Sequence, residues 1–136
     1  MNTNYFLDCV AGNVFGTKLT PAIPTKYYIG LSTQEPQLNG SGANEPSTDF
    51  NYARVELTSL SDPVDGVVTN NTAINFNESS GNWGLVTHFV IFDSDEVGEG
   101  NLLMFGALST PRSVETATIM TIKEGYLKLS AQNPAQ

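Results

Sequence analysis

The single histidine and the single cysteine are the residues best suited to proton transfer or nucleophilic chemistry. His88 can exchange protons near neutrality, because the ordinary pKa of a histidine is about 6.5. A base or metal ligand needs partners, yet the sequence holds no second histidine and no spaced ligand motif. Cys9 falls on the apolar side of a predicted helix, where buried thiols are usually inert. We expect a structural, hydrogen-bonded His88, with a Cys9–His88 dyad as the alternative.

Carboxylates gather in residues 93–101, which read DSDEVGEGN. The start of this segment resembles a calcium loop, because hard cations prefer several oxygen ligands within one short turn. Val97 stands at the fifth position, where a polar ligand is expected, and Met104 stands at the twelfth, where a glutamate would close the site. We interpret the segment as a solvated hairpin loop, with calcium binding as the alternative. No cofactor and no metal are predicted.

Four aromatic residues offer a different chemistry, the stacking of sugar rings on flat apolar faces. Their more ordinary role is packing in the core or at an interface. The four are Tyr27, Tyr28, Tyr52 and Trp83.

Net charge narrows the classes of partner, and cysteine content indicates the compartment in which the chain folds. Six basic residues against 14 acidic ones give a formal net charge of -8, which argues against nucleic acid and anionic membranes, since both are bound through clustered Lys and Arg. One cysteine excludes an intramolecular disulfide and favours folding in a reducing compartment. Neither an export signal nor an apolar run long enough for a membrane span is recognised. We expect a soluble protein.

These side chains must be positioned by a few regular elements, of which the first is a short helix. Apolar residues recur at helical spacing over residues 3–14, with Asn2 or Thr3 available as the N-terminal cap and Gly16 able to end the helix. The apolar stripe of this helix needs a surface to lie on. Either the chain's own sheet or a partner subunit can supply it.

The remaining periodicity is that of strands. Residues 83–93, WGLVTHFVIFD, are apolar on both faces, which predicts a central strand covered on both sides. Over residues 52–58, alternation predicts Tyr52 and Arg54 on the outward face. Residues 33–51 form a long polar loop, and such loops are often functional. Further strands are predicted at 26–32, 67–69, 73–76, 102–108 and, as a final pair, 116–122 with 126–129.

About eight short strands with one leading helix, and no alternation of strands with helices, indicate a mainly β fold. We predict an antiparallel β-sandwich or a jelly-roll-like barrel. A single domain covers residues 1–136, with residues 1–16 as a helix or docking segment and residues 26–130 as the β-sandwich.

The order of these pieces resembles a known family. The segments PAIPTKYYIGLSTQEP, NYARVELT and NNTAINFNESSGNWGLVTHFVIFDSDEVGEGNLLMFGALSTPRSV are similar to those of the small tail-fibre-like virion proteins of tailed bacteriophages. The resemblance covers nearly the whole chain. It implies a structural component of the particle, either in the tail or decorating the head, with no enzymatic residues to carry over.

The resemblance also implies partners and a location. We expect a non-enzymatic virion protein that is synthesised in the host bacterial cytoplasm, forms a homo-oligomer with a trimer favoured, and binds major capsid or tail proteins. The alternative is a carbohydrate-binding β-sandwich for receptor recognition, with a glycan as its ligand. The predicted interface or recognition residues are Tyr5, Phe6, Asn39, Ser41, Tyr52, Asp95 and Glu96.

Overall fold

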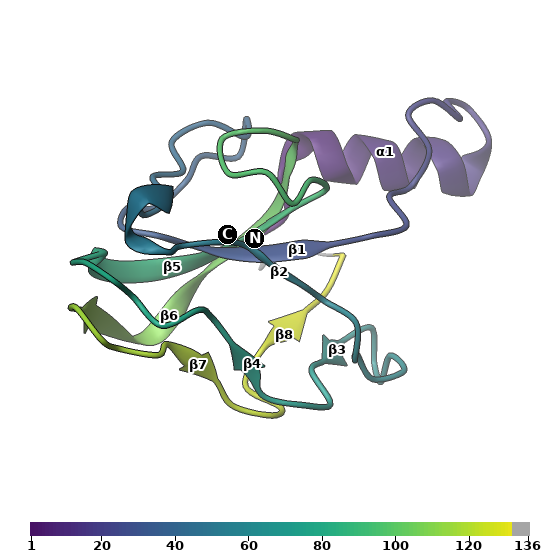
Figure 1. The fold of residues 1–136 in the computed structure, drawn as a ribbon. Coiled ribbons are helices and arrows are strands. Elements are labelled where there is room, and N and C mark those ends of the chain that lie inside the picture. The colour runs from purple at the N-terminus through teal and green to yellow at the C-terminus, as the bar shows by residue number, and fades with distance from the viewer. Residues whose placement is uncertain (132–136) are drawn as a thin grey trace.

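The computed structural model describes residues 1–131, and Figure 1 shows their fold. Over this range the chain forms one α-helix, one short 3-10 helix and eight strands, so the predicted mainly β fold is confirmed. The elements are α1 (Asn4–Phe15), β1 (Tyr28–Ser32), η1 (Thr48–Phe50), β2 (Val55–Glu56), β3 (Val68–Thr69), β4 (Ile74–Asn75), β5 (Gly84–Phe92), β6 (Leu102–Val114), β7 (Thr121–Ile122) and β8 (Lys128–Leu129). Residues 132–136 of the predicted single domain lie outside the described residues.

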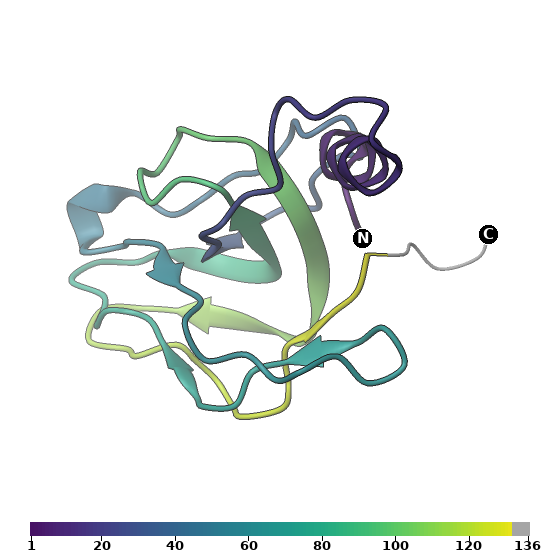
Figure 2. The same ribbon diagram turned by 90° about the vertical axis from the view of Figure 1, so that its right-hand side faces the viewer.

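The strands pair into three antiparallel sheets. The largest has the order β2-β1-β5-β6, and the two small sheets are β3 with β8 and β4 with β7. Figure 2 shows the small sheets on one side of the large one. The predicted antiparallel pairing is therefore confirmed, but the strands divide among three sheets and no closed barrel forms among the described residues.

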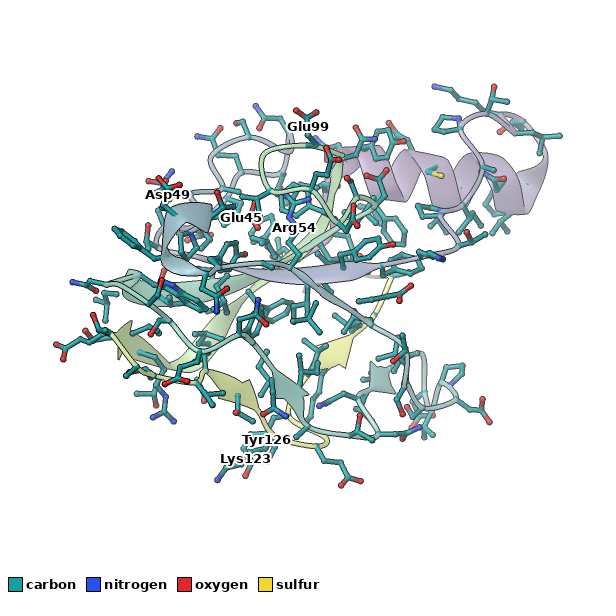
Figure 3. All side chains as sticks on the ribbon, viewed as in Figure 1. Glu45, Asp49, Arg54, Glu99, Lys123 and Tyr126 are labelled. Carbon is teal, nitrogen blue, oxygen red and sulfur yellow. The ribbon has the colours of Figure 1, made fainter. Side chains whose placement is uncertain are left out.

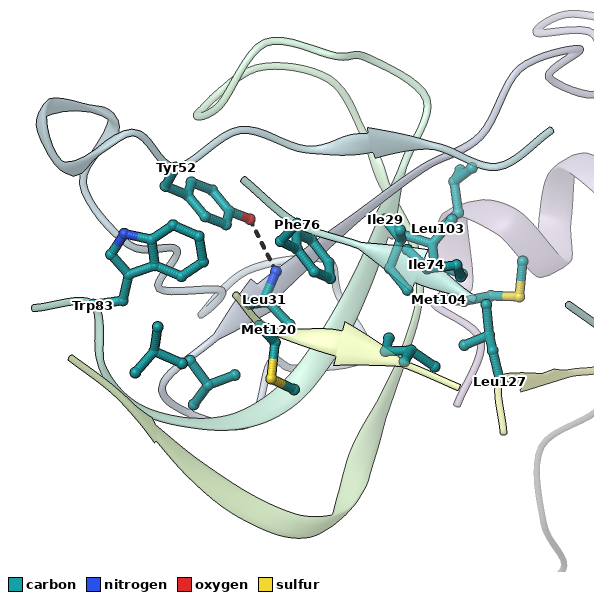
Figure 4. Close-up of a cluster of buried hydrophobic side chains, with 14 of the residues drawn as sticks. Ile29, Leu31, Tyr52, Ile74, Phe76, Trp83, Leu103, Met104, Met120 and Leu127 are labelled. Carbon is teal, nitrogen blue, oxygen red and sulfur yellow. Dashed lines mark hydrogen bonds between the residues drawn. The ribbon is translucent and has the colours of Figure 1, made fainter. Parts of the chain in front are cut away.

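The core lies between the large sheet and the small ones. It forms there because strand β5 carries apolar side chains on both of its faces. Val86 and Ile91 are fully buried on the side of the main cluster, which includes Ile74 of β4 and Leu127, the residue before β8 (Figure 4). Val90 and Phe92 belong to a second buried cluster. β5 is thus the predicted central strand, although Leu85 near its start is 53% exposed.

The helix α1 begins and ends where its local signals predict. Thr3 is the N-terminal cap, with its Oγ1 accepting a hydrogen bond from the Phe6 amide at 3.3 Å. Gly16 ends the helix in the left-handed conformation at a φ of 69°. Phe6 and Cys9 are buried, and Phe6 packs in the chain's own core, so the first part of the apolar stripe lies on the chain's own sheet, whereas Val14 near its end is exposed. Phe6, one of the predicted interface residues, is therefore buried in the core of its own chain.

The last two strands do not pair with each other, which corrects the predicted final pair. β7 pairs with β4 and β8 pairs with β3. The cause is Asn70, which is buried against the turn that joins β7 to β8: its Nδ2 donates to the Lys123 carbonyl at 3.0 Å and its Oδ1 accepts from the Leu127 amide at 3.0 Å. These bonds take the place of a hairpin ladder.

Candidate functional site

A buried cation lies beneath the two loops that the sequence marks as functional candidates. Arg54 is 7% exposed and Tyr52 is 3% exposed, so the prediction that both point outward is wrong. Burying a guanidinium is costly unless it is paired and hydrogen-bonded. The partner comes from the polar loop at residues 33–51, in the form of Glu45.

The contact between the two side chains is two-pronged. Arg54 Nη2 donates to Glu45 Oε2 at 2.7 Å, and Arg54 Nε donates to Glu45 Oε1 at 3.0 Å. The guanidinium carbon also lies 3.6 Å from the centre of the Phe92 ring, which adds a cation–π contact from below. One edge of the planar guanidinium thus bonds the Glu45 carboxylate, and one of its faces lies on the Phe92 ring.

The other edge of the guanidinium reaches the acidic loop at residues 93–101. Arg54 Nη1 donates to the Ser94 carbonyl at 2.8 Å and to the Glu99 carbonyl at 2.9 Å. Figure 3 shows Arg54 beside Glu45 and below Glu99, on the side of the molecule where both loops lie. Arg54 therefore ties the two loops together, and we call this group of contacts the Arg54 network.

Tyr52 anchors the same network to the large sheet. Its Oη donates to Glu45 Oε1 at 2.7 Å and accepts from the Leu31 amide at 2.9 Å. Burial, and then the Glu45 carboxylate, raises the pKa of Tyr52 far above its ordinary value. Gly30 makes room for these atoms, because a Cβ at that position would collide with Tyr52 Oη and Glu45 Oε1.

The predicted interface residues that lie outside the core fall into three places, which are two loops and the helix α1. Asn39 and Ser41 are exposed in a tight turn of the first loop, where Asn39 Oδ1 accepts from the Ser41 amide at 3.0 Å. Asp95 and Glu96 are exposed in the second loop. The Arg54 network joins these two loops. Their roles as interface residues stay predictions, as does that of the half-buried Tyr5.

Two of the four aromatic residues considered for sugar stacking lie in the core, which is the more ordinary role expected of them. Tyr52 and Trp83 pack edge to face in the core with ring centres 5.3 Å apart, as seen in Figure 4. Trp83 Nε1 donates to the Phe50 carbonyl at 2.9 Å, so its polar atom is also used internally. The prediction of Tyr52 as an exposed recognition residue is therefore wrong.

The residues suited to chemistry are engaged in separate local contacts. His88 is half-buried in β5 with its Nδ1 2.8 Å from Thr87 Oγ1, and it is the hydrogen-bonded strand histidine that was predicted. The Cys9 thiol donates to the Pro21 carbonyl at 3.4 Å. Asp93 accepts two hydrogen bonds from Asn101, at 2.7 and 3.0 Å. Within residues 1–131 no three His, Cys, Asp or Glu side chains are grouped so that they could hold a metal ion.

The comparison with protein families identifies the family of the chain. Residues 3–130 match the family model Gp80, which is described as podophage GP4 fiber I protein gp80. The chain belongs to this family. It is a phage fibre protein, and the predicted resemblance to tail-fibre-like virion proteins is confirmed. A search of curated proteins finds no match for it. No helix in residues 1–131 of this fibre protein is long and apolar enough to cross a membrane.

Proposed function

We propose that this fibre protein is a non-enzymatic subunit of the tail fibre, located in the virion, and that it assembles with copies of itself. The observation that carries the proposal is a group of exposed apolar side chains where α1 ends, which we call the apolar tip. It consists of Val14, Phe15, Leu19 and Ile23.

The apolar tip stands away from the chain's own core. In Figure 1 the carboxyl end of α1 extends beyond the sheets, whereas the residues nearer its start are packed on them. Phe15 is 78% exposed and Leu19 is 61% exposed, which is costly for a chain that remains alone in water. Several exposed apolar side chains within one short segment, here residues 14–23, are typical of an interaction site.

A second copy of the chain is the partner that fits the apolar tip best. Residues 11–23 contain one charged side chain, Lys18, so two copies can bury this surface with little cost in desolvated charge. Closed cyclic symmetry is the usual form of such self-association. We favour a trimer, with a dimer as the alternative.

The loops of the Arg54 network are proposed as the contacts with other tail proteins of the particle. The loops expose four of the predicted interface residues, Asn39, Ser41, Asp95 and Glu96. The buried ion pair of Arg54 and Glu45 holds the loops in place. Membership of a fibre family favours the tail over capsid decoration. Immunogold labelling of intact particles separates the two: gold on the tail supports the proposal, and gold over the head contradicts it.

Self-association is tested by light scattering after size-exclusion chromatography. The wild-type chain is expected to elute with the mass of an oligomer, and Phe15→Ser combined with Leu19→Ser is expected to give the mass of a monomer. The control is Val64→Ser, which changes a side chain that is 71% exposed outside the apolar tip. A monomeric wild-type chain, or a double variant with the wild-type mass, would overturn this part of the proposal.

A further inference from the structure

A groove on another face of the molecule has a different chemical character from the apolar tip. It has a volume of about 390 Å³, within the range of small-molecule binding sites. One wall comes from β6 and the other from β7 and the turn that follows it, with Phe89 of β5 also lining it. Figure 3 shows Lys123 and Tyr126 of this turn on the opposite side of the molecule from Arg54.

The β6 wall exists because β6 leaves the regular ladder. Val86 pairs with Arg112, and His88 pairs with Ala107. One residue of β5, Thr87, therefore faces four residues of β6, numbered 108–111. Such an excursion redirects side chains and often marks a functional position in a sheet. Here it directs β6 residues into the groove wall, including the exposed Ser109 and Thr110.

The groove is positively charged in an acidic protein. Of the chain's six basic residues, Arg54 is buried and Lys26 pairs with Glu56, while Arg112 and Lys123 line the groove. No Asp or Glu lines it. Within residues 1–131, neither Arg112 nor Lys123 forms an ion pair. Two cations on facing walls favour a ligand that carries carboxylates, because a guanidinium binds a carboxylate through paired hydrogen bonds.

An exposed aromatic ring completes the groove. Tyr126 is 72% exposed, and its backbone is held in the turn, where its amide donates to the Lys123 carbonyl at 3.0 Å. An exposed aromatic face on a fixed turn offers a surface on which a sugar ring can stack. The hydroxyls of Ser109 and Thr110, exposed on the other wall, make no hydrogen bond within the described residues and can bond ligand hydroxyls.

From this combination we infer that the groove binds a carboxylate-bearing oligosaccharide. The site is separate from the apolar tip, and the inference does not depend on self-association. Nucleic acid is disfavoured by the net charge of -8, since phosphate chains are bound through many cations.

Protection of a sheet edge is the competing explanation for part of the groove. Pro111 and Arg112 lie on an edge strand, where proline and charged residues prevent pairing with other chains. That explanation does not account for Lys123 and Tyr126, because they stand on the opposite wall. An acidic peptide added along β6 is therefore the rival ligand in the test.

The test is isothermal titration of the full chain with tetragalacturonate, 3′-sialyllactose, neutral maltotetraose and a hexaglutamate peptide. Binding is expected for at least one of the two acidic sugars, with none for maltotetraose or the peptide. Arg112→Ala combined with Lys123→Ala, and separately Tyr126→Ala, should each weaken binding about tenfold or more. The matched control is Lys18→Ala with Lys26→Ala, which alters net charge equally outside the groove and should change affinity less than twofold.

Several results would overturn the inference. These are absence of binding to both acidic sugars, equal binding of maltotetraose, binding of the peptide alone, or equal loss of affinity in the control variant. Circular dichroism of every variant shows whether it remains folded. The Phe15→Ser and Leu19→Ser double variant should retain sugar binding, which separates failure of this inference from failure of the proposed self-association.

Discussion

Arg54 and Glu45 form a two-pronged ion pair from which solvent is excluded: the Arg54 side chain is 0% exposed, that of Glu45 is 7% exposed, and Nη2 lies 2.7 Å from Oε2. Each side chain is the main reason that the other can be buried. Because Arg54 also donates to carbonyl groups of Ser94 and Glu99, the pair connects two loops and the large sheet. The shape of the loop surface therefore depends on one buried charge pair.

Glu45→Ala is expected to lower the free energy of unfolding by about 3–5 kcal/mol, because it leaves a buried guanidinium without its counter-charge. Glu45→Gln should cost less, since an amide oxygen can still accept from Arg54. Guanidinium chloride unfolding measures both. The matched control is Glu56→Ala, which removes the exposed pair with Lys26 at 3.8 Å and should cost less than about 1 kcal/mol. If both variants lost the same free energy of unfolding, water would be solvating the Arg54 guanidinium in place of the missing carboxylate.

Gly30→Ala is expected to destabilise the fold by about 1–3 kcal/mol, because the added methyl group collides with Tyr52 Oη and Glu45 Oε1. In a Tyr52→Phe background the hydroxyl is absent, so the same substitution should cost less. The measurement is a double-mutant cycle of unfolding free energies. If the two costs were additive, the backbone of β1 would shift to accommodate the methyl group, and the side chains of the Arg54 network would not.

Alkaline pH is expected to unfold the protein through Tyr52. Burial and the Glu45 carboxylate raise its pKa in the folded state, so the folded chain retains a proton that the unfolded chain loses at about pH 10. The stabilising contribution is complete below about pH 10 and is lost as pH rises further, by up to about 1.4 kcal/mol per pH unit.

This dependence is measured by denaturant unfolding between pH 8 and 11. Tyr52→Phe should flatten the decline without abolishing it, because the pKa values of Tyr5 and Tyr27 are also raised, mainly by burial. Absorbance at 295 nm should show one of the five tyrosines ionising only when the chain unfolds. An identical slope in Tyr52→Phe would refute the assignment.

Much of the fold could be predicted because its signals are local. The cap at Thr3, the stop at Gly16 and the two apolar faces of β5 each act within a few residues, and the structure confirms all three. The burial of Arg54 could not be predicted from strand alternation. Its counter-charge, Glu45, comes from a loop without periodicity, and alternation carries no information on which loop covers a strand.

The pairing of β7 and β8 shows a second limit of the sequence. Two short strands joined by a tight turn favour a hairpin on local grounds. The buried side chain of Asn70 satisfies the turn from a position more than fifty residues earlier, so each strand pairs elsewhere. The groove beside Tyr126 could not be predicted from the sequence for the same reason, because its walls meet only when β7 and β8 pair with other strands.

Asn70→Ala is expected to lower the free energy of unfolding by about 1–3 kcal/mol, because it leaves the buried Leu127 amide without its acceptor and removes one of the two donors to the Lys123 carbonyl. The turn that carries Tyr126 should loosen, which hydrogen exchange detects as faster exchange of the Leu127 amide. The neighbouring Asn71→Ala changes an exposed side chain and should alter stability by less than about 0.5 kcal/mol. If the Leu127 amide were protected equally in both variants, the β3–β8 ladder and not Asn70 would hold the turn, and the preorganisation of the groove would have to be assigned to that sheet.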